Sequence, residues 1–398
     1  MYADPLNSRQ TPYYLYDTAL LAQTLDAIKA ETQAHDNYHV HYAIKANANP
    51  VVLRQIAHAG LGADCVSGGE IRAAIEAGFA PEGIVFAGVG KADWEIRLAL
   101  ENDIFAFNVE SREELEIIAA MAAEMGYRAR VCLRINPDVG AHTHAHITTG
   151  KAENKFGIDR HDMVSVIRQT LSTPSLEFMG LHFHIGSQLL EMDDFVALSQ
   201  RINEFQEQLD TEGISLKNIN VGGGLGVDYD TPSANPVPDF KAYFAAYSDN
   251  LHLRPGQQLH FELGRAVVAQ MGSLITRVLY VKHGTQKRFA IVDAGFTELI
   301  RPALYGALHR IEPVSLEGNT LHFGNAADAA TEVYDVVGPI CESSDTFAKD
   351  YALPAVKRGD LLALRTAGAY GETMASTYNC RPLPVAYTVE ELASQNLQ

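Results

Sequence analysis

The chain has 398 residues, of which 47% are hydrophobic and 20% charged, and its formal net charge at pH 7 is −18. This composition is typical of a globular protein with a sizeable core, and the length suggests two domains or one large domain with an appendage. The acidic surplus argues against sequence-independent binding to nucleic acid or anionic lipid, because both need excess lysine and arginine.

The cysteines and the amino terminus bear on the cellular compartment. Cys65, Cys132, Cys341 and Cys380 are far apart and form no CxxC pair, so they indicate neither a zinc site nor a disulfide framework. The amino terminus has no basic stretch followed by an apolar core, and no run of about eighteen apolar residues occurs anywhere. We therefore expect a cytoplasmic protein with no secretion signal and no membrane span.

Residues 21–270 repeat one unit, in which a short apolar run is followed by a segment with helical spacing. Ser111 and Glu114 form a capping-box pattern before one of these helices, and Phe195 and Leu198 belong to the apolar face of another. Eight units in about 250 residues predict a (β/α)8 TIM-like barrel, with an open doubly wound sheet as the alternative. The candidate strands are 39–46, 62–67, 84–89, 104–109, 129–135, 179–186, 217–222 and 258–263.

The pattern changes after about residue 270, where β-rich segments follow one another with little helical periodicity. This predicts a C-terminal β domain over residues 271–398, which residues 1–20 join by adding the extended segment Tyr13–Tyr16. Two long polar loops, 137–155 and 226–239, interrupt the barrel region. Loops of that length inside a compact fold are usually functional.

Lys45 is the first candidate for chemistry, because it ends the first predicted strand in the run Tyr42-Ala43-Ile44-Lys45-Ala46-Asn47. The carboxyl ends of barrel strands carry the active site. A lysine that is partly desolvated there has a lowered pKa and can form a Schiff base with an aldehyde. The alternative is a solvated lysine that only contributes to solubility.

Other predicted strands also end in polar or glycine-rich segments, which a barrel would bring to the same mouth. The run Gly222–Gly224 is either a tight turn or a cradle for phosphate, and Ser187 and Arg265 favour the phosphate. Glu262 either pairs with Arg265 or keeps a heterocyclic nitrogen protonated, as pyridoxal phosphate requires. His184 is either buried structurally or stacked on that ring.

Two further segments hold reactive side chains outside these strand ends. His142, His144 and His146 alternate in one loop, but no carboxylate or cysteine completes a metal-ligand set, so we reject a metal site. The segment Cys341–Asp345 combines a thiol with carboxylates in the β domain. An isolated cysteine of this kind is more often inert packing.

Together these motifs resemble the fold-type III pyridoxal-phosphate-dependent decarboxylases, whose alanine racemase-like architecture is a barrel followed by a β domain. Within that group, Asn154–Ile158, Leu299–Tyr305 and Gly338–Asp345 are similar to segments of the diaminopimelate decarboxylase family. The likeness runs from about residue 11 to about residue 385, with the motifs in the family's order. One departure is Leu263, where the family prefers the proline of Glu-Pro-Gly-Arg.

The resemblance implies an enzyme of the carboxy-lyase class that converts meso-2,6-diaminopimelate to L-lysine and CO2, the last step of lysine biosynthesis. Lys45 would hold pyridoxal 5'-phosphate covalently, His184 would stack on its ring, and Glu262 would pair with its ring nitrogen. The remaining cofactor-binding candidates are Asp64, Ser187, Gly222, Gly223, Gly224, Gly264, Arg265 and Tyr370.

The same resemblance implies substrate contacts and a homodimer with shared active sites. Cys341 would return a proton to the product, and Glu342 would bind the distal ammonium. Both residues would reach into the partner subunit's site. A guanidinium suits the second carboxylate that distinguishes diaminopimelate from other diamine precursors. The substrate-binding candidates are Arg265, Arg301, Tyr305, Glu342 and Tyr370.

Three alternatives remain open on the sequence. The nearest is a decarboxylase of another diamine precursor, such as carboxynorspermidine, ornithine or arginine. A second is an amino-acid racemase on the same barrel, which would retain the carboxylate. A third is a non-catalytic relative that regulates a partner enzyme by dimerising with it. A substrate panel and the detection of CO2 separate them.

Overall fold

The computed structural model describes residues 5–139, 155–318, 320–324 and 330–394. The chain divides into two compact units, which are described separately below. The barrel unit comprises Leu25–Gly226 and Asp239–Val267. The β unit comprises the chain up to Thr24, the segment Val227–Pro238 and the chain from Val268 onward. Val227–Pro238 thus groups with the β unit although it lies between two barrel strands in the sequence.

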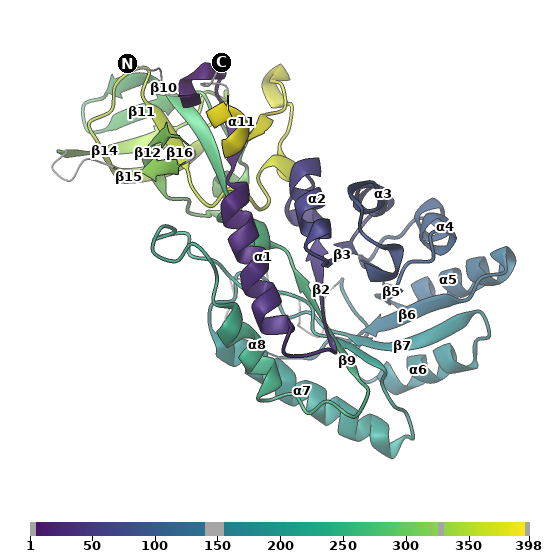
Figure 1. Cartoon of the computed structure of the whole chain (residues 1–398). Coiled ribbons are helices and arrows are strands. Elements are labelled where there is room, and N and C mark those ends of the chain that lie inside the picture. Colours follow the sequence, from purple (N-terminus) through teal and green to yellow (C-terminus); the bar gives the residue numbers. More distant parts are fainter. Residues whose placement is uncertain (1–4, 140–154, 319, 325–329, 395–398) are drawn as a thin grey trace. The chain divides into compact units, whose positions relative to one another are not determined.

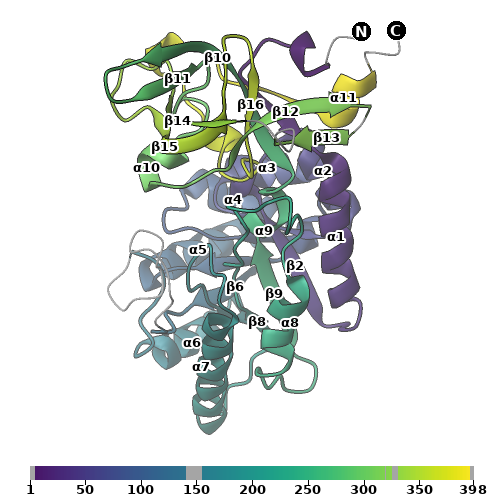
Figure 2. The same cartoon turned by 90° about the vertical axis from the view of Figure 1, so that its left-hand side faces the viewer.

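The barrel unit is a closed barrel of eight parallel strands, as the sequence predicted (Figures 1 and 2). The first and last strands pair with each other, with His41 opposite Glu262, and this pairing closes the barrel. The strands in order are β2 (Tyr38–Ala43), β3 (Gly62–Cys65), β4 (Ile84–Phe86), β5 (Ala106–Val109), β6 (Ala129–Arg134), β7 (Leu176–His182), β8 (Asn218–Asn220) and β9 (Gln258–Leu263).

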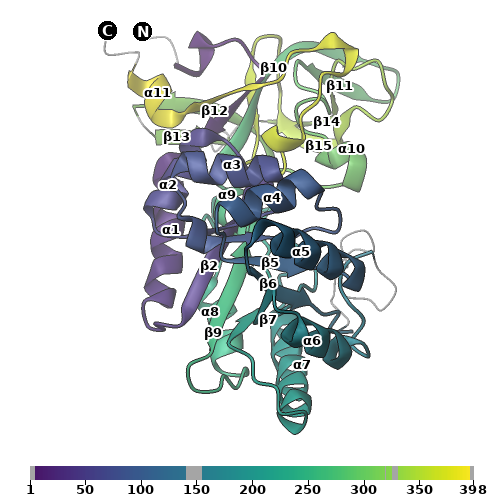
Figure 3. The ribbon, with the colours of Figure 1, turned by 90° about the vertical axis from the view of Figure 1, so that its right-hand side faces the viewer.

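Helices alternate with these strands, and α2, α3, α4 and α5 lie side by side in chain order (Figure 3). The helices up to the end of the barrel are α1 (Thr18–Thr32), α2 (Pro50–His58), α3 (Gly68–Ala77), α4 (Asp93–Glu101), α5 (Arg112–Met125), α6 (Met163–Ser172), α7 (Met192–Thr211), α8 (Phe240–Ser248) and α9 (Arg265–Val268). No helix in the described ranges is both long and apolar enough to span a bilayer.

The predicted helix start at Ser111 shows how local sequence positions these helices. The hydroxyl of Ser111 caps α5 by accepting a hydrogen bond from the Glu114 backbone N–H at 3.1 Å. The reciprocal half of the capping box differs from the prediction, because the Glu114 carboxylate accepts from the N–H of Glu110 at 2.8 Å, one residue before the cap. That carboxylate also forms an ion pair with Lys91 at 2.6 Å.

The first barrel strand ends earlier than the sequence predicted. β2 stops at Ala43, and Lys45 lies in a short 3-10 turn, Ile44–Ala46, rather than in the strand. The backbone N–H of Asn47 donates to the carbonyl of Ile44 at 3.1 Å, which closes the turn. The hydroxyl of Tyr42 donates to the carbonyl of Asn47 at 2.9 Å and anchors the turn to the strand.

The β unit contains a nine-stranded, mostly antiparallel sheet. The predicted strand Tyr13–Tyr16 is present as β1, which pairs with β10 antiparallel and with β17 parallel. The remaining strands are β10 (Gly272–His283), β11 (Arg288–Val292), β12 (Ile311–Glu317), β13 (Thr320–Phe323), β14 (Thr331–Val337), β15 (Thr346–Pro354), β16 (Leu361–Leu364) and β17 (Val385–Thr388). Two short helices, α10 (Arg301–Tyr305) and α11 (Val389–Ser394), accompany them.

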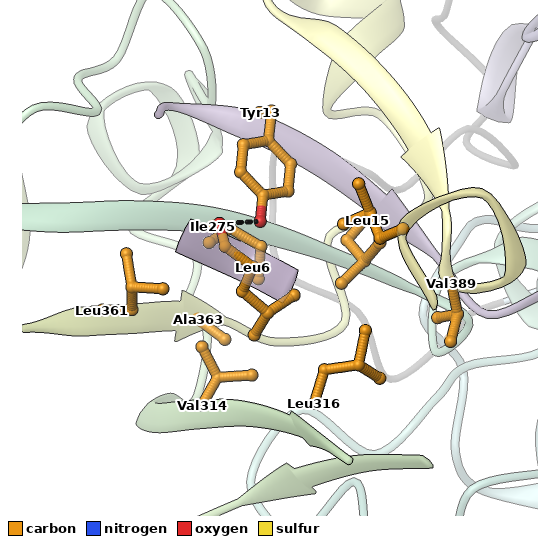
Figure 4. Packing of buried hydrophobic residues seen from close by; sticks show 10 residues of the cluster. Leu6, Tyr13, Leu15, Ile275, Val314, Leu316, Leu361, Ala363 and Val389 are labelled. Carbon is orange, nitrogen blue, oxygen red and sulfur yellow. Dashed lines mark hydrogen bonds between the residues drawn. The ribbon is translucent and has the colours of Figure 1, made fainter. Parts of the chain in front are cut away.

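A buried apolar cluster holds the amino-terminal segment to this sheet (Figure 4). Leu6, Tyr13 and Leu15 pack against residues of β10, β12 and β16, including Ile275. The hydroxyl of Tyr13 donates to the carbonyl of Leu6 at 3.0 Å, so the polar end of the ring is satisfied inside the cluster. The first residues of the described chain are therefore an integral part of the β unit.

Candidate active site

Lys45 lies at the carboxyl end of β2, beside a buried carboxylate at the end of β3. Its Nζ is 3.7 Å from Oδ2 of Asp64. The side chain of Lys45 is 45% exposed, whereas that of Asp64 is 2% exposed. The short turn that carries Lys45 leads into α2, whose first turn is capped by Asn49 through a 3.0 Å hydrogen bond from the Val51 N–H. The lysine amine is thus presented to solvent from a firmly anchored turn.

The pKa of the Asp64 carboxyl is raised, so this group is protonated more easily than an ordinary aspartate. Burial raises the pKa of Asp64, and the negative charge of Glu262 raises it further, while Lys45 opposes both effects. Its Oδ1 atom is buried and has no hydrogen-bond partner among the described residues. A buried polar atom without a partner is costly unless a ligand or water satisfies it. The unpaired oxygen is consistent with a site that receives a polar ligand.

Glu262, near the end of β9, is held by three side chains from β5, β7 and β8. Its Oε1 accepts hydrogen bonds from Asn108 and Asn220, each at 2.8 Å, and its Oε2 lies 3.1 Å from Nε2 of His182. Burial by itself raises the pKa of such a carboxyl, but His182 and Lys45 outweigh it and hold the pKa of Glu262 well below its ordinary value. The carboxylate therefore stays ionised inside the barrel.

The histidine proposed to stack on a ring lies just beyond its strand. β7 ends at His182, so His184 is in the following loop, where its Nδ1 lies 3.5 Å from the N–H of Gly223. Burial, with the charges of Arg134 and Lys45, lowers the pKa of His184 well below its ordinary value. The ring is neutral, which suits stacking on a flat, electron-poor heterocycle.

The loop after β8 needs glycine, because neighbouring backbone lies too close for a side chain. A Cβ at Gly223 would lie 1.9 Å from the carbonyl oxygen of Glu262, and one at Gly222, whose φ is +69°, would lie 2.4 Å from the carbonyl oxygen of Phe183. The N–H of Gly222 donates to Oδ1 of Asn220 at 2.9 Å. The loop is therefore pressed against the ends of β7 and β9, where only glycine fits.

Ser187 and Arg265, the two residues that the sequence offered for phosphate, form a hydrogen bond in the barrel unit. Arg265 follows Gly264 at the start of α9, and its Nη2 donates to the hydroxyl of Ser187 at 3.0 Å. Arg265 is buried. On the sequence alone, an ion pair between Arg265 and Glu262 was the alternative to a role in phosphate binding. Glu262 instead takes its hydrogen bonds from Asn108, Asn220 and His182.

The other candidate residues belong to the β unit. Arg301 begins α10 and is only 6% exposed, while Tyr305, at the end of the same helix, is 50% exposed. Tyr370 has a φ of +56°, a left-handed conformation that non-glycine residues rarely adopt and that often marks functional positions. Cys341 and Glu342 are exposed.

The turn that carries Cys341 is organised by a buried aspartate. The carboxylate of Asp345 accepts the N–H groups of Phe296 at 2.7 Å and Ile340 at 2.8 Å. Asp345 also lies so close to Gly338 that a Cβ there would be 2.3 Å from its Oδ2. These contacts stabilise the turn, on which Cys341 is exposed.

Sequence reasoning missed two asparagines that hold Glu262 in place and a buried ion pair of the barrel unit. Asn108 and Asn220 lie in or at the end of β5 and β8, and Arg134 ends β6, where it pairs with the buried Glu110 at 2.9 Å. Their common signal is a polar residue at the carboxyl end of a barrel strand, the same signal that identified Lys45. The histidines at positions 142, 144 and 146 lie outside the described residues.

Comparisons with known proteins agree with this architecture. The family model described as "Pyridoxal-dependent decarboxylase, pyridoxal binding domain" matches residues 21–269. Diaminopimelate decarboxylase of Bacteroides thetaiotaomicron is 61% identical over 389 residues, which cover 98% of each chain. The enzyme of that name from Pseudomonas aeruginosa is 44% identical, with 93% of this chain and 86% of that protein covered.

Solved structures of the same family superpose over nearly the whole chain. A crystal structure of diaminopimelate decarboxylase from Helicobacter pylori, complexed with L-lysine, matches with a TM-score of 0.87 and 38% identity and covers 98% of each chain. One from M. jannaschii, also with L-lysine, matches with a TM-score of 0.82 and 34% identity, and covers 96% of this chain and 88% of that one. The chain therefore belongs to the diaminopimelate decarboxylase family of pyridoxal-dependent decarboxylases.

Proposed function

We propose that this protein decarboxylates meso-2,6-diaminopimelate to L-lysine and CO2 with pyridoxal 5'-phosphate as its cofactor, the last step of lysine biosynthesis. The observation that carries the cofactor chemistry is the buried Glu262 carboxylate, which accepts hydrogen bonds from three side chains and is kept ionised by His182 and the Lys45 amine. The substrate rests on the relatives, because a protein 61% identical over 98% of the chain is named for it.

The residues at the barrel mouth fit this cofactor. Lys45 supplies an amine for the aldehyde, and Glu262 supplies an anion for the ring nitrogen. Arg265 and Ser187 supply donors for the phosphate, next to a glycine loop in which a Cβ would meet backbone. Asp64 keeps one unpaired buried oxygen for a polar group.

When bound, pyridoxal phosphate supplies an electron-withdrawing ring that accepts the electron pair released as the carboxylate leaves. Glu262 would keep a proton on the ring nitrogen of the cofactor, because the pKa of its own carboxyl is held well below its ordinary value. His184 contributes a flat neutral ring. Lys45 would hold the cofactor through its amine, which can bond to the aldehyde.

The β unit supplies the groups proposed for substrate recognition. Arg301 binds the distal carboxylate through its planar guanidinium fork, assisted by Tyr305, and Tyr370 contacts the substrate. Arg265, which belongs to the barrel unit, is a candidate for both the phosphate and the substrate. Glu342 binds the distal ammonium, and the thiol of Cys341 returns a proton to the carbon that has lost CO2. Exposure of both side chains on a hydrogen-bonded turn suits residues that act on a second subunit.

We further propose a homodimer in which that turn completes the partner's site. Exposed apolar side chains on and after α10, namely Leu304, Tyr305 and Leu308, support an interface on the β unit. We also propose that the enzyme works in the cytoplasm, where its four cysteines, all free in the structure, would remain reduced.

The direct test is to incubate the purified protein, loaded with pyridoxal phosphate, with meso-diaminopimelate and to measure lysine and CO2. Lys45→Ala should lose the visible absorbance of the lysine-linked cofactor. Arg301→Ala should raise the KM for diaminopimelate about 10- to 150-fold and retain the cofactor, because a hydrogen bond to a charged group contributes about 1.5–3 kcal/mol. Absence of lysine from the wild-type reaction would refute the proposal.

A further inference from the structure

The guanidinium of Arg301 is held from two directions inside the β unit. Its Nη1 is 2.9 Å from Nε2 of His309, and its central carbon lies 5.0 Å from the centroid of the Tyr229 ring. Arg301 is 6% exposed and His309 4% exposed, so both contacts are shielded from water. Arginine has donors only, so Nε2 of His309 must be the acceptor.

The other ring nitrogen sets the tautomer of His309. Its Nδ1 lies 2.9 Å from the backbone carbonyl oxygen of Arg365, which can only accept, so Nδ1 carries the proton. The ring is therefore neutral, with its lone pair directed at Arg301. The backbone at Arg365 is itself fixed, because its N–H donates to the carbonyl of Arg310 at 2.8 Å.

Tyr229 lies in Val227–Pro238, which is part of the polar loop 226–239 that the sequence predicted to be functional. Its ring stands edge-on to His309, with centroids 5.2 Å apart and planes at 84°. Asp228 shapes the loop by accepting the N–H groups of Asp230 at 2.8 Å and Thr231 at 2.7 Å. The face of Tyr229 over a buried guanidinium is a favourable cation–π arrangement.

We propose that His309 and Tyr229 are positioning residues that orient the Arg301 guanidinium for the distal carboxylate and thereby set the preference for substrates with a second carboxylate. This inference rests on the proposed function, in which Arg301 is the carboxylate ligand. A guanidinium binds a carboxylate best when its plane is already aligned, since a flexible side chain loses rotamer freedom on binding. His309 aligns one edge of the fork, and Tyr229 fixes its plane.

The test compares two ligands that differ only in this carboxylate. L-Lysine keeps the carboxylate that the reaction leaves in place, whereas 1,5-diaminopentane lacks it. Their dissociation constants are measured by calorimetry on the cofactor-loaded protein, together with KM and kcat for diaminopimelate. His309→Leu should raise the Kd for lysine and the KM at least about tenfold, with kcat within about threefold and the Kd for 1,5-diaminopentane within about twofold.

Matched variants separate positioning from general damage. His309→Gln keeps an acceptor where Nε2 lies and should recover most of the lost affinity for lysine. Tyr229→Leu should raise the Kd for lysine about fivefold. Tyr229→Phe, which keeps the ring, should recover most of that lost affinity. His322→Leu, at a half-exposed histidine of the same unit, serves as the control and should change the Kd of neither ligand.

Two outcomes overturn the inference. One is a Kd for lysine within twofold of wild type in His309→Leu. The other is an equal rise in the Kd values for lysine and 1,5-diaminopentane in His309→Leu, which would show that His309 has a purely structural role. The proposed function is judged separately, by lysine formation in the wild-type protein. Should Arg301→Ala leave the Kd for lysine unchanged while the wild type makes lysine, then the carboxylate ligand is another residue and the positioning role falls with it.

Discussion

Substitution of Gly223 by alanine tests the close packing behind Glu262. A Cβ at this position would lie 1.9 Å from the carbonyl oxygen of Glu262, whereas real Cβ contacts are essentially never shorter than 3.0 Å. The glycine loop and β9 must therefore separate by about 1 Å. Both contacting atoms belong to backbone or lie next to it, so no flexible side chain can absorb the shift.

The expected loss of stability follows from two effects. Overpacking of this kind costs about 1–3 kcal/mol. The hydrogen bond from the Glu262 N–H to the carbonyl of Gly222, 2.8 Å long, is weakened as the strands separate and contributes about 1 kcal/mol more. Gly223→Ala should thus lower the free energy of unfolding by about 2–4 kcal/mol, recorded by urea denaturation of the cofactor-free protein.

Gly90→Ala is the matched control, because no atom lies within 4 Å of a Cβ built there. That variant should be neutral or more stable by about 0.4–1 kcal/mol, through the smaller entropy of its unfolded chain. The reasoning is wrong if Gly223→Ala unfolds within 0.5 kcal/mol of Gly90→Ala, since the structure leaves no room for the methyl group.

Three further predictions concern buried polar groups. Asn220→Leu removes a donor to Glu262 and the acceptor of a loop N–H, so urea denaturation should show a loss of about 2–4 kcal/mol, and a loss below 1 kcal/mol would contradict this. Arg134→Leu leaves the buried Glu110 without its cation and should cost about 3–5 kcal/mol, whereas replacing both residues by leucine should restore much of the stability; equal losses in the two variants would refute the pairing. Burial lowers the pKa of His41 to about 4, so this ring stays neutral in the fold while an unfolded histidine takes up a proton near pH 6.5. The free energy of unfolding should therefore fall by about 3 kcal/mol as the pH drops from 6.5 to 4, and an unchanged pH dependence in His41→Gln would argue against this assignment.

The barrel was readable from the sequence because its strands are short, apolar and separated by helical patterns, so each can be recognised locally. Their ends were less predictable. The predicted strand 39–46 stops at Ala43, because a hydrogen bond from Asn47 and the hydroxyl of Tyr42 favour a turn there. Such contacts depend on where side chains point after the strand leaves the sheet, which periodicity does not encode.

The hydrogen-bond partners of Glu262 could not be predicted from the local sequence, for another reason. Asn108 is 154 residues away from it and Asn220 is 42 residues away, and only the folded barrel brings the three side chains together. The segment Val227–Pro238 is a similar case. Its composition indicated a functional loop. No local sequence pattern indicated that it joins the β unit, where the Tyr229 ring contacts the guanidinium of Arg301.

The sequence by itself determined the fold class and the family, and it supplied the candidate site residues, because all of these depend on short runs such as those around Lys45, Gly222–Gly224 and Glu262. Only the tertiary structure decided which partners keep Glu262 ionised and which neighbours orient Arg301. The physical reason is that a buried charge is set by groups within a few ångströms in space, and chain closure, not sequence distance, selects those groups.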